Sequence, residues 1–99
     1  MASSKEYKDY VLEQLDNVTY KPMMGEYLLY YNGLLFGGIY DERLLVKKNG
    51  NNKKYNMEEV IPYPNAKGMY YVEDVDNQEL LKNIVLDTCE GLVIKWIEN

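Results

Sequence analysis

The stretch "MMGEYLLYYNGLLFGGIYDERLLV", residues 23–46, decides the fold of this chain. Aromatic and aliphatic residues that favour strands alternate in it with short turn signals. Asn32 and Gly33 form the residue pair best able to adopt the positive φ angles of a type I′ turn, whose twist matches that of paired strands. Asp41 and Glu42 form the next two-residue break. The stretch therefore predicts antiparallel strands joined in a meander.

Two adjacent glycines, Gly37 and Gly38, interrupt the middle strand of this meander. Glycine weakens a strand unless a bulge, or the close approach of another backbone, needs a position without a side chain. We predict one of these two features here. Residues 18–24 precede the meander, and Pro22 lacks an amide hydrogen, so this segment is predicted to be a short or peripheral strand.

The N-terminal segment "SSKEYKDYVLEQLDN" predicts a helix over about residues 4–15. Ser3 and Glu6 have the spacing of a capping box, which satisfies the free amides of a first helical turn. Tyr7, Tyr10, Val11 and Leu15 fall on one face at helical spacing, with Lys8, Asp9 and Glu13 turned away.

The C-terminal third predicts a strand over residues 69–73 and then a helix with Asp76 as N-cap, Glu79 closing the capping box and Gly91 as its stop. Between the lysine-rich segment and this strand, residues 56–68 predict a helical turn followed by an extended segment, because residues before Pro62 and Pro64 are pushed out of the helical region. The tail "GLVIKWIEN" is too apolar to stay free of contacts, so we expect it to pack on the core, add a strand or meet another chain.

Strands grouped together and flanked by helices, with no repeating strand–helix units, predict an α+β fold. We expect two layers, an antiparallel meander of about three to five strands with helices packed on one face. A length of 99 residues is the size of one domain with one core, so residues 1–99 are predicted to form a single domain.

Composition restricts the classes of partner. The net charge is −5, and residues after Lys67 carry seven acidic side chains against two basic ones. Direct DNA binding is therefore not expected, apart from a lysine-rich segment in which Lys47, Lys48, Lys53 and Lys54 could contact phosphate. The asparagines and glycine of that segment favour a solvated loop instead. A lone cysteine, a polar N-terminus and the lack of a long apolar run predict a cytoplasmic protein without a membrane span.

No enzymatic arrangement is visible, so we expect no catalysis, cofactor or metal. The chain has no histidine, the commonest acid–base group at neutral pH and a frequent metal ligand. Cys89 is expected in the core, beside helix acids that disfavour a thiolate. The acidic run "EDVDNQE", residues 73–79, lacks the glycine and the final glutamate of a calcium-binding loop, so helix capping explains it better.

Taken together, "VTYKPMMGEYLLYYNGLLFGGIYDERLLVK", "PYPNAKGMYYVEDVDN" and "ELLKNIV" resemble the N-terminal domain of the TfoX/Sxy competence regulator family over about residues 3–88. The resemblance implies a bacterial two-layer α+β domain similar to the secretion-chaperone fold, and a positive regulator of competence-gene transcription that acts with other regulators at promoters. The second, helical domain of the full-length regulators is not expected here. We interpret the family's motif positions as architectural in this chain: Met24, Gly25, Gly33, Gly37, Gly38, Tyr40 and Asp41.

Two departures from the family pattern matter. The asparagines and Gly50 in residues 49–56 disfavour the middle helix of the relatives, so we expect a turn there. Relatives end in a polar tail, whereas here Trp96, with Val93 and Ile97, offers a surface for a partner or for a homodimer.

The first hypothesis is thus a cytoplasmic regulatory or adaptor domain that binds protein, with the transcription machinery or a regulator as partner by resemblance. It would use the exposed sheet face or the Trp96 tail. The alternatives are phosphate contact by the four lysines and an enzyme based on Tyr, Lys and carboxylate groups.

Overall fold

The computed structural model describes residues 3–98, with side chains up to residue 94. Its elements follow one another in the order α1 (Lys5–Glu13), β1 (Val18–Met23), β2 (Glu26–Tyr31), β3 (Leu34–Tyr40), β4 (Arg43–Val46), η1 (Lys53–Tyr55), β5 (Glu58–Val60), β6 (Met69–Val72) and α2 (Gln78–Glu98).

The strands form one antiparallel sheet in the order β1-β2-β3-β4-β6-β5. β2, β3 and β4 are the predicted meander, and β1 extends it by one strand, so that each of the first four strands pairs with the next one along the chain. β6 then pairs with β4, and β5 pairs with the outer side of β6. The sheet has six strands, more than the expected three to five, because residues 58–60, where a helical turn was expected, form the strand β5 instead.

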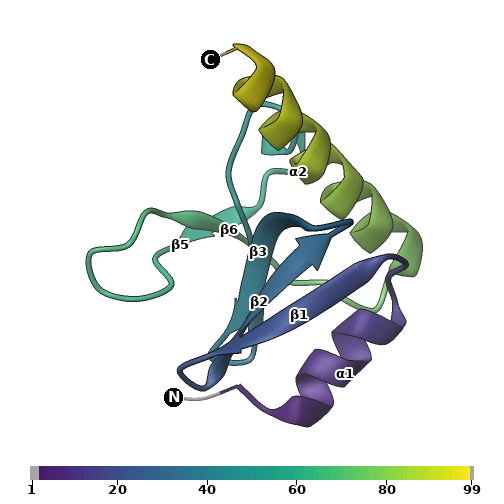
Figure 1. The fold of residues 1–99 in the computed structure, drawn as a ribbon, viewed down its shortest axis with the longest axis vertical. Coiled ribbons are helices and arrows are strands. Elements are labelled where there is room, and N and C mark those ends of the chain that lie inside the picture. Colours follow the sequence, from purple (N-terminus) through teal and green to yellow (C-terminus); the bar gives the residue numbers. More distant parts are fainter. Residues whose placement is uncertain (1–2, 99) are drawn as a thin grey trace.

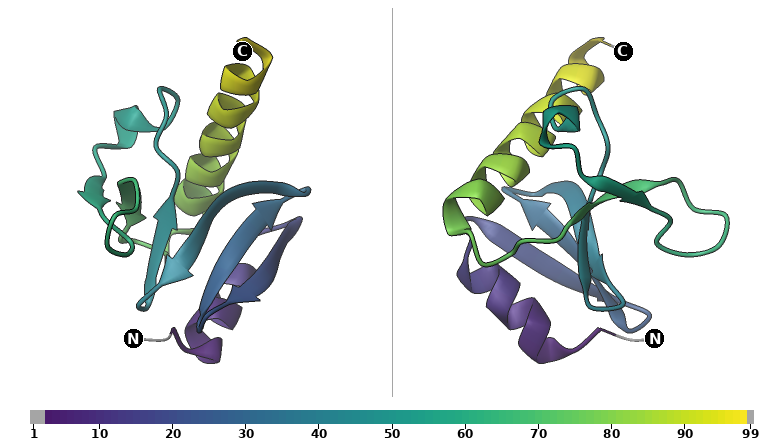
Figure 2. Two further views of the ribbon diagram at one scale, coloured as in Figure 1. Left: turned by 60° about the vertical axis from the view of Figure 1, so that its left-hand side comes forward. Right: turned by 180° about the vertical axis from the view of Figure 1, so that it is seen from behind.

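Both helices lie on the same side of the sheet (Figure 1). The core between the two layers combines side chains from both helices and from five segments of the sheet side: Val11, Leu29, Phe36, Ile39, Leu44, Val46, Val72, Val75, Leu81, Ile84, Val85 and Cys89. The connection between β5 and β6 projects from the body on the side away from the helices (Figure 2). The predicted two-layer α+β architecture is thus confirmed.

Three two-residue connections join the meander. Asn32 and Gly33 have φ angles of 48° and 85°, as the type I′ prediction requires. Met24 and Gly25 adopt the same region between β1 and β2, with φ angles of 50° and 84°. Asp41 (φ 54°) and Glu42 (φ 60°) do so between β3 and β4, so the predicted second break is also a turn.

The two glycines of β3 occupy a bulge and a close approach at once. The pairing of β2 with β3 shifts between Leu29 and Tyr30, so Phe36 is the extra residue on β3. A Cβ atom on Gly37 would lie 2.2 Å from the carbonyl oxygen of Leu45 on β4. A Cβ atom on Gly38 would lie 2.6 Å from the carbonyl oxygen of Tyr27 on β2. Both predicted features are therefore present.

The N-cap of α1 is Ser4, so the predicted Ser3–Glu6 capping box is wrong. The Ser4 hydroxyl accepts a hydrogen bond from the Tyr7 amide at 3.1 Å. Ser3 has a different role, because its amide and hydroxyl both donate to the carboxylate of Glu26, at 2.9 and 2.7 Å.

The predicted faces of α1 also need correction at two residues. Lys8 was expected to face solvent, but only 3% of it is exposed. Its Nζ atom lies 4.0 Å from the ring centroid of Tyr20 on β1 and 2.6 Å from the Asp9 carboxylate, whose hydrogen bond raises the pKa of Lys8. Its aliphatic stem can be buried because the charge is met by a ring face and a carboxylate. Tyr10, expected on the apolar face, is 39% exposed and donates its hydroxyl to Asp76.

The start and the end of α2 differ from the prediction. The N-cap is Asn77, not Asp76, because its side-chain oxygen accepts from the Leu80 amide at 3.1 Å and its carbonyl from the Leu81 amide at 2.9 Å. Gly91 does not stop the helix, which continues to Glu98. A Cβ atom at Gly91 would lie 2.3 Å from the side chain of Asn49, so this glycine serves a close contact inside the helix. The apolar tail therefore extends the helix.

Three further predictions are confirmed. β1 is peripheral, since it forms one edge of the sheet, although with six residues it is not short. The middle helix is reduced to the single turn η1. The predicted strand over residues 69–73 is β6.

We expect Gly37→Ala to lower the free energy of unfolding by about 2 kcal/mol or more, because the new methyl group must displace the β4 backbone. Urea unfolding followed by circular dichroism measures this change. Gly50→Ala is the matched control, because nothing lies within 4 Å of a Cβ atom there, and it should change stability by less than about 0.5 kcal/mol. Equal effects of the two substitutions would show that the close approach to Leu45 does not constrain the strand.

Candidate functional site

Three large apolar side chains are exposed on α2, and we call them the α2 stripe: Leu86, Val93 and Ile94. Their exposed fractions are 47%, 44% and 41%. Leu86 and Val93 lie two helical turns apart on the side of α2 that faces away from the core. The last turns of α2 extend past the sheet (Figure 1). The stripe is thus an apolar surface that the described part of the chain leaves open to water.

The predicted tail surface overlaps with the α2 stripe at one position. Val93 is exposed on α2, as the prediction requires. The side chains of Trp96 and Ile97 lie outside the described side chains. Leu86 and Ile94 were not predicted. The helix was expected to end at Gly91, so residues on either side of that glycine were not placed on one helix.

The segment with the four lysines is an ordered loop held against α2 by asparagine side chains. Asn52 is fully buried, and its amide nitrogen donates to the carbonyl of Lys47 at 2.7 Å and to the hydroxyl of Thr88 at 2.9 Å. Asn49 donates to the carbonyl of Thr88 at 2.8 Å. The asparagines that suggested a solvated loop therefore form its anchor, and we call Asn49, Asn52 and Thr88 the loop anchor.

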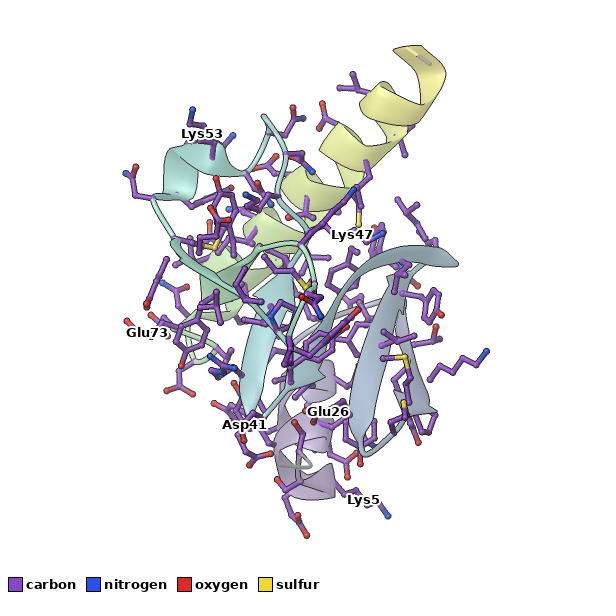
Figure 3. The ribbon with its side chains drawn as sticks, turned by 90° about the vertical axis from the view of Figure 1, so that its left-hand side faces the viewer. Lys5, Glu26, Asp41, Lys47, Lys53 and Glu73 are labelled. Atoms are coloured by element: carbon purple, nitrogen blue, oxygen red, sulfur yellow. The ribbon has the colours of Figure 1, made fainter. Side chains whose placement is uncertain are left out.

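The four lysines do not converge on one point. Lys48 pairs with Glu59 at 2.8 Å, and Lys54 pairs with Asp87 at 3.2 Å. Lys47 and Lys53 lie apart across the loop (Figure 3). Two of the four lysines thus already form ion pairs with acidic side chains of the same chain, which argues against a phosphate contact by all four.

The family-motif positions have architectural surroundings in the structure. Met24, Gly25, Gly33 and Asp41 form the three hairpin turns. Gly37 and Gly38 form the bulge and the close approach described above, and the ring of Tyr40 packs within 2.8 Å of the Cβ position of Gly38.

One residue of the same motif was missed. The carboxylate of Glu26, at the start of β2, accepts the two hydrogen bonds from Ser3 and a third from the Asp41 amide at 3.1 Å. The Ser3 hydroxyl accepts from the Glu42 amide at 3.0 Å. Glu26 thereby ties the N-terminal segment to the β3–β4 turn, and Figure 3 shows Glu26 and Asp41 at the same end of the sheet. No local sequence signal marks a contact between segments so far apart in the chain.

Three side chains on α2 or beside it have shifted pKa values: Cys89, Tyr55 and Asp87. Cys89 lies in the core, 6% exposed, and burial raises the pKa of its thiol to about 11, as the core prediction requires. Burial and a hydrogen bond to Asp87 raise the pKa of Tyr55 to about 12. The same hydrogen bond, with the Lys54 ion pair, lowers the pKa of Asp87. Asp87 therefore connects η1 to α2 as a carboxylate.

Among residues 3–94, whose side chains the structure describes, no three His, Cys, Asp or Glu side chains are placed to share a metal ion. None of the helices in this part of the chain combines the length and apolar character needed to cross a membrane.

The sequence model of the TfoX N-terminal domain family matches residues 10–85 of the chain. No curated protein and no solved structure matches the chain. The matched range contains the whole sheet, the loop anchor except Thr88, and the first turns of α2. The residues of the α2 stripe come after residue 85, so the family match says nothing about that surface.

We expect Asn52→Ala to lower the free energy of unfolding by about 3 kcal/mol, because three hydrogen bonds of a buried side chain are lost. Urea unfolding measures the change. Asn51→Ala, in which only a backbone amide takes part in the loop's hydrogen bonds, is the control and should change stability by less than about 0.5 kcal/mol. A neutral Asn52→Ala would rule out the loop anchor.

The stability that comes from Asp87 should depend on pH. Because the pKa of folded Asp87 lies below its ordinary value of 3.8, its contribution is present above that pH and is lost as pH falls through the folded value. Asp87→Asn should cost about 1.5 kcal/mol at pH 7, and the difference from wild type should shrink below pH 3.8 in urea unfolding. Asn83→Ala, at an exposed position of the same helix that carries no titratable group, should show no such dependence. A pH-independent difference for Asp87→Asn would contradict the assignment.

Proposed function

This chain belongs to the family of the TfoX N-terminal domain, and from that membership we propose that it is a cytoplasmic regulatory domain that acts by binding another protein and catalyses no reaction. The resemblance to the competence regulators supports a partner in transcription regulation. The single cysteine of the sequence supports a reducing compartment, and its burial with a raised thiol pKa speaks against a cysteine nucleophile.

The observation that carries this proposal is the α2 stripe. Each of its side chains keeps more than two fifths of its surface in water, on a helix whose other face supplies the core. Apolar surface gains free energy when a partner covers it, at about 25 cal/mol per Å² removed from water. A rigid helix presents such side chains without a large entropic cost of ordering, which favours binding.

The occupant we propose for the stripe is a protein partner with its own apolar surface, with a second copy of the chain as the homodimer case. An antiparallel pair of α2 helices would bring Leu86 of each copy toward Val93 of the other, which suits a two-fold contact. Direct DNA binding is the weaker reading, because Lys48 and Lys54 already have acidic partners.

We expect Val93→Glu to abolish binding of the partner, because a buried unpaired charge is costly at an apolar contact. The measurement is affinity capture from the native cytoplasm at low and at high salt, together with sedimentation equilibrium of the purified chain. Met24→Glu is the matched control, since Met24 is 98% exposed in the turn between β1 and β2, away from α2 and from β5.

A protein or a dimer that withstands high salt and is lost only with Val93→Glu supports the proposal. Recovery of nucleic acid alone, released by salt, would overturn it and favour the lysines. Binding that Val93→Glu leaves intact would show that the α2 stripe is not the contact.

A further inference from the structure

A cleft of about 350 Å³ lies on a different side of α2 from the stripe. It is bounded by the first turns of α2, the end of β6 with the residues that follow it, and the segment from η1 into β5. Its lining consists of Tyr55, Asn56, Met57, Glu58, Tyr71, Val72, Glu73, Asp74, Leu80 and Ile84. All of these residues fall inside the range that the family matches.

The cleft combines an apolar floor with an acidic rim. Val72 and Ile84 are buried core residues, and Leu80 packs against them. Glu58, Glu73 and Asp74 are exposed at the rim, and in the described part of the chain none of the three takes part in an ion pair. Asp74 does accept hydrogen bonds from the amides of Asp76 and Asn77, at 3.1 and 3.2 Å.

The charge around the cleft is not balanced by nearby lysines. Lys54, the basic residue next to Tyr55, is engaged by Asp87 at 3.2 Å, and Lys48 by Glu59 at 2.8 Å. Figure 3 shows Glu73 at the left margin of the molecule. The lining itself holds three carboxylates and no basic side chain, a composition that favours cations over phosphate and other anions.

Arginine and lysine side chains match this surface in both of its properties. Their aliphatic stems can cover an apolar floor while their charged ends reach an acidic rim. The rings of Tyr55 and Tyr71 add faces on which a guanidinium group can rest. Charge complementarity thus selects a basic partner for the cleft.

The edge of the sheet beside the cleft favours an extended peptide as the source of these side chains. β5 ends the strand order, so its outer edge is unpaired within residues 3–98, and Glu58 belongs both to β5 and to the cleft lining. A peptide that adds a strand to such an edge gains main-chain hydrogen bonds, and pockets beside the edge read its alternate side chains.

We propose that the cleft and the β5 edge together bind an extended basic segment of a partner protein, with an arginine or lysine side chain held over Val72, Leu80 and Ile84 and its charge among Glu58, Glu73 and Asp74. The site is separate from the α2 stripe, so it adds a second, electrostatically selected contact to the proposed function and does not depend on the first.

The test uses a fluorescent ten-residue peptide of alternating arginine and valine and measures its binding to the purified chain by anisotropy. The double substitution Glu58→Gln with Glu73→Gln should weaken binding about tenfold, because two exposed charges at the site are removed with little change of shape. Glu13→Gln with Glu90→Gln, which removes the same charge from exposed positions outside the cleft lining, should leave binding unchanged. Urea unfolding confirms that both double variants fold.

A second peptide, N-methylated at alternate residues, keeps the charges but cannot add a full strand, so it should bind at least about tenfold more weakly. Equal weakening by the two double substitutions would overturn the proposal, since net charge alone would then explain binding. Equal binding of the methylated peptide would overturn the strand addition. The Val93→Glu variant should bind the peptide as tightly as the wild type does. Loss of the contact at the α2 stripe can therefore be distinguished from loss of the contact at the cleft.

Discussion

The fold depends on the absence of side chains at two adjacent positions of β3. Gly37 and Gly38 let the backbone of this strand approach β4 on one side and β2 on the other more closely than any Cβ atom would permit. The bulge at the same place turns Phe36 toward the helices, so that it is buried in the same core as Ile39. Since β3 is the strand against which α2 packs, the position of the long helix follows from the two glycines.

Features that a few neighbouring residues determine could be predicted from the sequence. The turn at Asn32 and Gly33 needs positive φ angles, and the bulge in β3 needs positions without a side chain. Asparagine and glycine are the residue types that meet these requirements, so both features can be predicted from the sequence. Helix caps were predicted one residue too early at both helices, because adjacent Ser3 and Ser4, or Asp76 and Asn77, are almost equally good caps. The tertiary contacts of Ser3 decide the choice at α1.

Features that distant segments determine could not be predicted in this way. Lys8 is buried because Tyr20 offers a ring face from another element, and Asn52 is buried because Thr88 lies opposite it. Polar residue types alone indicate a solvated position in both cases. The two candidate surfaces differ in the same respect. Val93 was predicted from its apolar neighbours in the sequence, whereas the acidic cleft forms only where residues 55–58, 71–74 and 80–84 meet in space.

The contact between Asn49 and Gly91 links two parts of the molecule thermodynamically. A glycine inside a helix lowers its stability by about 1 kcal/mol relative to alanine, so α2 has a weak point there. The asparagine of the loop fills the space above it and also binds the carbonyl of Thr88. The loop and the second half of α2 are therefore joined at Thr88 and Gly91 by the side chain of one residue. A side chain larger than hydrogen at residue 91 would therefore have to displace Asn49 and, with it, the hydrogen bond to the carbonyl of Thr88.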